Sequence, residues 1–258
     1  MPVAGLDDLE VLLDAGRLVL RFNRPDALNA LTPGMLEKAA DRIHAASGDP
    51  EIRVVVITGI GRAFSSGADI GDGGTDVTGT LDGANHLVHA IVHSAKPVVA
   101  GVNGLAAGVG ATIALSCDLQ VVRGSAYLLL AFANIGLMPD GGATAIVPAA
   151  IGRARASRMA LLGERIPAAQ ALEWGLVSHV ADDDAYDNEL EALVAKLANG
   201  PTLAYGRTKA ALADATLAGL DAAHTTERAG QLALFDTADY VEGTAAFRER
   251  RTAEFHGR

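Results

Sequence analysis

Two glycine-rich turns are the parts of this sequence whose residue types and spacing could do chemistry. Each of them, Phe64–Asp69 and Gly104–Gly110, follows an apolar run typical of a buried strand. Open α/β sheets bind ligands where their strands end, and glycine lets backbone N–H groups come close to a ligand there. Two N–H groups aimed at one oxygen form an oxyanion hole. The pair therefore indicates a site that holds an oxygen with main-chain donors, whereas each turn taken alone is better explained by close packing.

Asp140, in the segment Pro139-Asp-Gly-Gly142, is a carboxylate for which two roles can be considered. A partly desolvated carboxyl group with a raised pKa can carry a proton between two carbons. Pro-Asp-Gly is also a common helix start, in which the aspartate caps the first turn. The residues alone leave both interpretations of Asp140 open.

Other chemistries find little support. The chain has no Gly-x-Ser-x-Gly elbow and no Walker loop, and the glycines of Gly104–Gly110 do not follow the dinucleotide-binding spacing. His86, His89 and His93 fall at helical spacing and could in principle hold a metal. Because there is no other Cys/His cluster, a solvated helix face explains them better, and no metal is expected.

Composition narrows the class of protein. With 258 residues, 50% of them hydrophobic and 20% charged, the chain can bury a sizeable core. A formal net charge of −10 argues against a nucleic-acid partner. The single cysteine, Cys117, suits a reducing compartment, and the absence of a signal pattern predicts a cytoplasmic protein. The nearly uncharged run Val98–Cys117 resembles a membrane span, but its central Asn103-Gly104 turn favours a strand followed by a helix, so no membrane partner is expected.

Periodicity and turn residues predict alternating strands and helices. The expected strands cover residues 10–13, 17–22, 53–58, 97–102, 118–123 and 176–180. The expected helices cover 33–47, 81–94, 106–116, 143–150, 154–162 and 167–174, followed by helices from residue 187 onward with breaks near 199 and 219. The glycine-rich segment Gly71–Gly83 is predicted to be a mobile loop, with Asp72 and Asp76 solvated. The pattern favours an α/β fold with a C-terminal helical layer.

Several motifs together resemble the crotonase (enoyl-CoA hydratase/isomerase) superfamily, in order and with matching gaps. They are Asn23-Arg-Pro-Asp-Ala-Leu-Asn-Ala-Leu31, Val54-Val-Val-Ile-Thr-Gly59, Ala63-Phe-x-Ser-Gly-Ala-Asp-Ile70, Lys96-Pro-Val-Val-Ala-x-Val-Asn-Gly104, Ser116-Cys-Asp-Leu119, Ile135-Gly-Leu-x-Pro-Asp-Gly141 and Ala168-x-x-Ala-x-x-x-Gly-Leu-Val177. The resemblance implies a spiral of ββα units over residues 1–198. It also implies a helical region over 199–258 that takes part in oligomerisation and covers the site. Further implications are a homotrimer or homohexamer, an acyl-CoA substrate, and no cofactor beyond the coenzyme A of that substrate.

The resemblance also implies roles for individual residues. The N–H groups of Ala68 and Val109 would form the oxyanion hole for the thioester carbonyl. The Ala27-Leu28 segment and the Ser66–Ile70 backbone would line the adenine end, and Arg24 and Arg62 are candidates for the phosphates. Asp69 is expected to brace its own turn. The full set of implied substrate-binding residues is Arg24, Ala27, Leu28, Ser66, Gly67, Asp69, Ile70, Leu105, Gly108, Thr112, Phe132 and Ile135.

The acid/base positions depart from the hydratase pattern. The two glutamates of classical hydratases fall on Thr112 and Phe132, which are expected to line the acyl pocket and cannot shuttle protons at neutral pH. Asp140 matches the catalytic aspartate of dienoyl-CoA isomerases and of ring-opening isomerases in phenylacetate degradation. An enzyme that moves a double bond is therefore expected. The alternatives are a hydratase that activates water through Asp140 and a substitute group, and a non-catalytic acyl-CoA binder.

Overall fold

A computed structural model describes residues 8–70 and 76–258. Its larger sheet has the strand order β1-β2-β3-β5-β7-β10, in which β1 and β2 form an antiparallel hairpin and the other neighbours are parallel. These strands are β1 Leu9–Asp14, β2 Arg17–Phe22, β3 Val54–Gly59, β5 Val98–Val102, β7 Leu119–Arg123 and β10 His179–Ala181. A second sheet has the order β4-β6-β8-β9. Its strands are β4 Ala63–Ser65, β6 Leu105–Ala107, β8 Tyr127–Leu129 and β9 Ile166–Pro167.

The chain repeats one unit, in which a strand of each sheet is followed by a helix. The units are β3-β4-α2, β5-β6-α3 and β7-β8-α4, where the helices are α2 Val77–His93, α3 Val109–Ser116 and α4 Ala143–Leu162. The short 3-10 helix η2, Ala131–Ile135, precedes α4. The α/β fold built from ββα units is thus confirmed.

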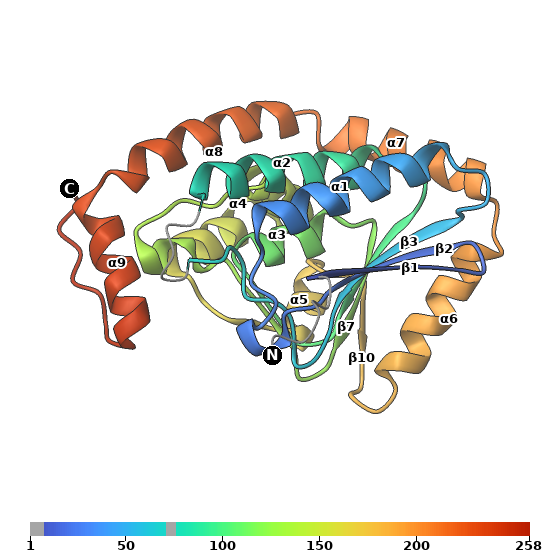
Figure 1. The fold of residues 1–258 in the computed structure, drawn as a ribbon, viewed down its shortest axis with the longest axis horizontal. Helices are drawn as coiled ribbons and strands as arrows, with labels where there is room; N and C mark the ends of the chain where they lie inside the picture. Colours follow the sequence, from blue (N-terminus) through green and yellow to red (C-terminus); the bar gives the residue numbers. More distant parts are fainter. Residues whose placement is uncertain (1–7, 71–75) are drawn as a thin grey trace, which may run out of the picture.

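Helices cover both faces of the larger sheet, which explains why its strands are continuous apolar runs. Val55 and Ile57 pack in the main core beneath α1 (Pro33–Gly48) and α2. Val54 and Val56 face the other way, against α6 (Tyr186–Ala198). Figure 1 shows α1 and α2 side by side along one side of the sheet. Helix α1 begins where the sequence predicts, because the Thr32 hydroxyl accepts a hydrogen bond from Met35 N at 3.3 Å and proline follows at the first helical position.

Four expectations about elements and their residues need correction. Residues 106–116 do not form one helix, because Gly108, at φ 52°, separates β6 from α3. Helix α2 begins at Val77, so the predicted loop is wrong over residues 77–83, while 71–75, including Asp72, lie outside the described residues. Asp76 is not merely solvated, since its carboxylate caps α2 by accepting a hydrogen bond from Gly79 N at 2.7 Å. The last strand is predicted over residues 176–180, but it covers only His179–Ala181, as β10.

Helices later in the chain extend over the same body. Helix α5, Ala168–Trp174, follows β9, and α4 is interrupted at Gly152, as the two separate predicted helices imply. After α6 come α7 Thr202–Thr216, α8 Leu220–Phe235 and α9 Ala238–Glu249. Helix α7 packs on α2, α8 packs on α2 and α4, and α9 lies against η2 at one end of the molecule (Figure 1). No helix within residues 8–70 and 76–258 combines the length and the apolar character needed to cross a membrane.

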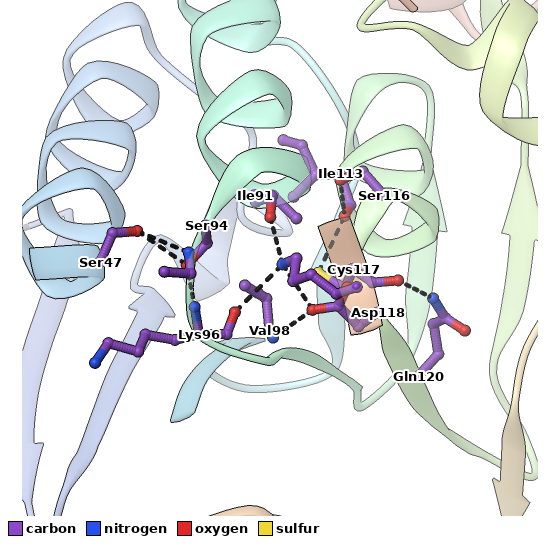
Figure 2. Close-up of polar contacts among 12 residues, drawn as sticks. Ser47, Ile91, Ser94, Lys96, Val98, Ile113, Ser116, Cys117, Asp118 and Gln120 are labelled. Atoms are coloured by element: carbon purple, nitrogen blue, oxygen red, sulfur yellow. Dashed lines mark hydrogen bonds and ion pairs between the residues drawn. The ribbon is translucent and has the colours of Figure 1, made fainter. Parts of the chain in front are cut away.

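An ion pair between buried Lys209 and half-buried Asp118 fastens α7 to the sheet. Lys209 Nζ lies 2.8 Å from Asp118 Oδ2 and donates a hydrogen bond to Ile91 O, at the end of α2, at 2.7 Å. The same carboxylate oxygen accepts a hydrogen bond from Val98 N at 2.7 Å (Figure 2). Burial raises the pKa of Asp118, and the Lys209 ammonium opposes that shift. One lysine therefore joins α7 to the end of α2 and, through Asp118, to the starts of β5 and β7.

We expect Lys209→Met to lower the free energy of unfolding by about 1–3 kcal/mol, because it leaves the half-buried Asp118 carboxylate without its cation. Urea unfolding at neutral pH and fixed protein concentration measures the loss. The double variant Lys209→Met/Asp118→Asn removes the orphaned charge and should recover part of it. A loss below about 1 kcal/mol in the single variant would mean that the pair behaves like an exposed one.

Candidate active site

A cavity of about 340 Å³ opens between the two glycine-rich turns and the C-terminal helices. It brings together Ala68, Val109 and Asp140, which the sequence places on three separate segments. Among the other substrate-binding residues expected from the sequence, the cavity is lined by Ser66, Gly67, Asp69, Ile70, Gly108, Phe132 and Ile135.

The two turns pack directly on each other because both carry glycine at the contact. Gly67 has φ 98° and Gly108 has φ 52°, a left-handed region that residues with side chains rarely adopt. A Cβ at Gly67 would lie 2.9 Å from Ala107 O, and a Cβ at Gly108 would lie 3.7 Å from Gly67 Cα. The contact places the backbones of Ala68 and Val109 on neighbouring turns at one cavity.

The N–H groups of these two residues are available to a ligand. Leu31 N donates to Gly67 O at 2.8 Å and Asp69 N donates to Leu31 O at 3.0 Å, so the Ala68 N–H, between them, points away from Leu31. Val109 is the first residue of α3, where a helix leaves its N–H groups without intrahelical partners. Within the described part of the chain, neither group donates a hydrogen bond. Two unused donors on adjacent turns are what an oxyanion hole requires.

Asp140 faces this cavity with an unusual proton affinity. Its Oδ2 accepts a hydrogen bond from Gln231 Nε2 on α8 at 3.1 Å, and its buried Oδ1 has no partner among the described residues. Burial and, to a lesser extent, the negative charge of Glu227 raise the pKa of Asp140 to about 8, while the Gln231 hydrogen bond opposes the shift. Asp140 is therefore mainly protonated at pH 7. Because its pKa lies close to neutral pH, it can both take and give a proton.

Asp140 does not cap α4, so the helix-cap interpretation is wrong. The N-cap residue of α4 is Gly142, which has no side-chain cap. Instead Glu227, fully buried on α8, accepts hydrogen bonds from Gly142 N and Thr144 N, both at 2.7 Å, and from Thr144 Oγ1 at 2.6 Å. No local motif announces Glu227, because it lies 85 residues after Gly142. The only sequence signal is a polar residue at a helix position that becomes buried.

Phe132 and Thr112, which occupy the positions of the two hydratase glutamates, lie differently with respect to the cavity. Phe132 lines the cavity as expected, beside Gly108, where its Cζ would lie 3.9 Å from an added Cβ. Thr112 does not line the cavity, which corrects the expectation. It is fully buried one turn into α3, and its hydroxyl donates to Asp140 O at 3.1 Å. Thr112 therefore holds the backbone of Asp140 rather than contacting the cavity.

Besides Thr112, four residues of the expected substrate-binding set lie outside the cavity lining, as does the phosphate candidate Arg62. Arg24 is engaged elsewhere, since its Nη1 donates to Asp69 Oδ2 at 2.8 Å and to Ala30 O at 2.7 Å. This pair braces the turn that carries Ala68. Ala27 and Leu28 adjoin that turn, because Leu28 O accepts a hydrogen bond from Ser66 N at 2.9 Å, whereas Leu105 lies in β6.

Aromatic residues from the C-terminal helices are the lining that sequence reasoning missed. Phe235, Tyr240 and Phe247 of α8 and α9 close the cavity, together with Arg165 and Gln231. The rings of Phe235 and Tyr240 lie 5.3 Å apart. Helix α9 approaches η2 closely at Gly243, where an added Cβ would lie 2.6 Å from Ile135 Cα. The 4% aromatic content of the chain gave no sign of this pocket, because its members come from helices with no local signature.

The three histidines of α2 do not form a metal centre with other ligands. The rings of His89 and His93 lie 4.3 Å apart, and the described residues contain no group of three or more His, Cys, Asp or Glu side chains placed to share an ion. His86 instead pairs with Glu37.

Comparisons with known proteins identify relatives of this chain. The sequence profile of the enoyl-CoA hydratase/isomerase family matches residues 14–258. A 1,2-epoxyphenylacetyl-CoA isomerase of Escherichia coli is 37% identical over 95% of this chain and 97% of its own length. A 2,3-dehydroadipyl-CoA hydratase of the same species is also 37% identical, over 93% of this chain and 95% of its own length. The crystal structure of an enoyl-CoA hydratase from Mycobacterium avium subsp. paratuberculosis superposes with a TM-score of 0.93 at 47% identity, covering 98% of this chain and all of the other. The chain belongs to the enoyl-CoA hydratase/isomerase family.

Proposed function

We propose that the protein isomerises a carbon–carbon double bond in an acyl-CoA, with Asp140 as the group that moves the proton. The observation that carries this proposal is that Asp140 lines the same cavity as the free N–H groups of Ala68 and Val109. The other acidic residue of the described lining, Asp69, is paired with Arg24. One carboxyl group without an ion pair, beside an oxyanion hole, is sufficient for a proton shuttle, and the described lining offers no second free acid to position water.

The reaction needs two proton transfers at the same carboxyl group. In a 3-enoyl-CoA, ionised Asp140 removes a proton from C2, and the electron pair moves onto the thioester oxygen. The N–H groups of Ala68 and Val109 stabilise the resulting enolate oxygen. The protonated Asp140 then returns the proton to C4 as the carbonyl reforms, and the double bond now joins C2 and C3. A pKa near 8 makes Asp140 a stronger base than an ordinary carboxylate, which suits removal of a proton from carbon.

The surroundings of Asp140 support isomerisation over hydration. Phe132, 7% exposed, presents an aromatic wall next to Gly108, at a position where the resemblance places a hydratase glutamate. Thr112, at the other such position, is fully buried and lies outside the cavity lining. Because an apolar wall offers a water molecule no hydrogen bonds, it does not orient one for attack on C3.

We also propose that the enzyme needs no cofactor beyond the coenzyme A of its substrate, and that it works in the cytoplasm as a homotrimer or homohexamer. The buried thiol of Cys117 suits a reducing compartment. Exposed leucines support assembly, namely Leu161, Leu162, Leu203 and Leu212. Sedimentation equilibrium tests the assembly, and a monomer at micromolar concentration would contradict it.

Asp140→Asn tests the function directly. We expect the variant to lose about 10²–10⁴-fold in kcat for conversion of 3-enoyl-CoA to 2-enoyl-CoA, because the amide cannot accept the proton. Formation of the conjugated thioester followed by absorbance measures this rate. Hydration of 2-enoyl-CoA, measured in parallel, separates the candidates. Water addition by the wild type that survives in Asp140→Asn would remove Asp140 from the mechanism, and binding without turnover of either thioester would identify a binder.

Val109→Pro tests the oxyanion hole. Proline is favoured at the first position of a helix, so the change removes the N–H donor while α3 keeps its intrahelical hydrogen bonds. We expect kcat to fall about 10²–10³-fold with a smaller effect on KM. Val109→Ala is the matched control, since it shortens the same side chain and keeps the donor. Equal losses in the two variants would show that the side chain, and not the N–H, matters.

The raised pKa of Asp140 predicts a pH-dependent stability difference. The folded protein keeps the Asp140 proton up to a pH near 8, whereas the unfolded chain loses it near 4. Wild-type stability therefore falls relative to Asp140→Asn by on the order of 1.4 kcal/mol per pH unit across that window. Urea unfolding of both proteins at pH 5 and pH 7 measures the difference. A difference that stays constant with pH would mean that Asp140 has an ordinary pKa.

A further inference from the structure

Helix α8 presents a polar stripe to the segment that carries Asp140. His224, Glu227 and Gln231 follow one another at helical spacing, and Glu227 and Gln231 are both fully buried. Burying a charge or an amide is costly unless hydrogen bonds compensate for the lost water. Both side chains direct their bonds to residues 138–144, which indicates that this stripe serves the Asp140 segment.

Glu227 holds a negative charge near Asp140. Its carboxylate accepts hydrogen bonds from Gly142 N, Thr144 N and Thr144 Oγ1, at the start of α4. The positive end of the α4 dipole and charge-assisted bonds both stabilise the ionised form. Burial raises the pKa of Glu227, and these hydrogen bonds oppose the shift. Its charge disfavours a second negative charge on Asp140.

Gln231 acts on Asp140 in the opposite sense. Its Nε2 donates to Met138 O at 2.6 Å and to Asp140 Oδ2 at 3.1 Å, so both amide hydrogens are used. The bond to Oδ2 stabilises the Asp140 carboxylate and fixes the rotation of its carboxyl group. Oδ1, buried and without a partner in the described chain, remains as the oxygen able to exchange a proton with a ligand in the cavity.

We propose that Glu227 and Gln231 are positioning residues that set the balance between the acid and base forms of Asp140. Glu227 favours the neutral acid through its charge, and Gln231 favours the carboxylate through its hydrogen bond. This inference rests on the isomerase function proposed above, in which Asp140 must alternate between the two forms. It assigns to α8, far from the glycine-rich turns in sequence, control over the proton transfer.

Other titratable groups near this stripe do not replace Glu227. His224 approaches Gly142, but burial lowers its pKa and so favours its uncharged form. Asp221 on α8, and His89 and His93 on α2, act on His224. The group from α3 that reaches the Asp140 segment, the Thr112 hydroxyl, is uncharged. Within the described residues, Glu227 is the charged group that shifts the pKa of Asp140.

Two substitutions on α8 should move the proton equilibrium of Asp140 in opposite directions. The readout is kcat/KM for 3-enoyl-CoA against pH, which reports the free enzyme and should rise to a plateau with a midpoint near 8 in the wild type. Glu227→Gln removes the neighbouring charge, so we expect the midpoint to fall by about one pH unit. Gln231→Leu removes the bond to the carboxylate, so we expect a rise of about half a unit to one unit. Glu189→Gln, an exposed change on α6 with the same loss of charge, should leave the midpoint in place.

A substrate-free measurement separates this inference from the proposed function. The infrared carbonyl band of protonated Asp140, identified by its loss in Asp140→Asn, can be titrated in each variant and should show the same opposite shifts. Unmoved midpoints with only lower thermal stability would overturn the inference and leave Glu227 a helix cap. If Glu227→Gln fails to fold, Gln231→Leu still tests the inference. A midpoint that stays in place or falls in Gln231→Leu would contradict the role proposed for Gln231. Isomerisation retained in Asp140→Asn would instead overturn the proposed function, while the infrared titration would still test the pair.

Discussion

The contact between Gly67 and Gly108 is the constraint on which the rest of the site depends. A side chain at Gly67 would collide with the Ala107 carbonyl, so the two turns can approach only as bare backbone. That approach sets the Ala68 N–H beside the first N–H of α3, where the helix supplies an unpaired donor and the positive end of its dipole. Arg24 and Asp69 then brace one of the turns from the outside. The ββα repeat delivers both turns to the same place, because β4 and β6 are parallel neighbours.

The carboxyl group that we propose to move the proton depends on a different part of the chain. A segment such as Pro139-Asp-Gly-Gly142 would ordinarily use its aspartate to cap the following helix. Here Glu227 of α8 takes over the cap, which leaves the Asp140 carboxyl group free to face the cavity. Because Glu227 is negatively charged, its presence at the start of α4 also disfavours ionisation of Asp140. The hydrogen bonds by which Glu227 caps α4 therefore also hold its negative charge near Asp140.

Features of the fold and site that depend on neighbours in sequence were predictable, and those that depend on α8 and α9 were not. The Thr32 cap, the buried strand β3 and the breaks near residues 199 and 219 all follow from local residue types. The glycine-rich turns were also recognisable locally. Thr112 and Arg24 were misplaced because their partners, the Asp140 carbonyl and the Asp69 carboxylate, are set by tertiary packing. Glu227, Gln231 and the aromatic lining could not be predicted, because the residue pattern of an amphipathic helix does not indicate which of its polar side chains become buried.

The burial that makes Asp140 a strong base also limits which reaction it can support. A carboxyl group with a pKa near 8 spends most of its time protonated at neutral pH, so only a minor fraction can begin a proton abstraction. The small size of this fraction is offset by the higher basicity of the Asp140 carboxylate, which matters most when the proton leaves carbon. Hydration gains less from this arrangement, because water must also be oriented, and Phe132 offers no hydrogen bond at the wall where that would occur. These features of the Asp140 environment are the basis for proposing the transfer of one proton between two carbons, and not the addition of water, as the reaction.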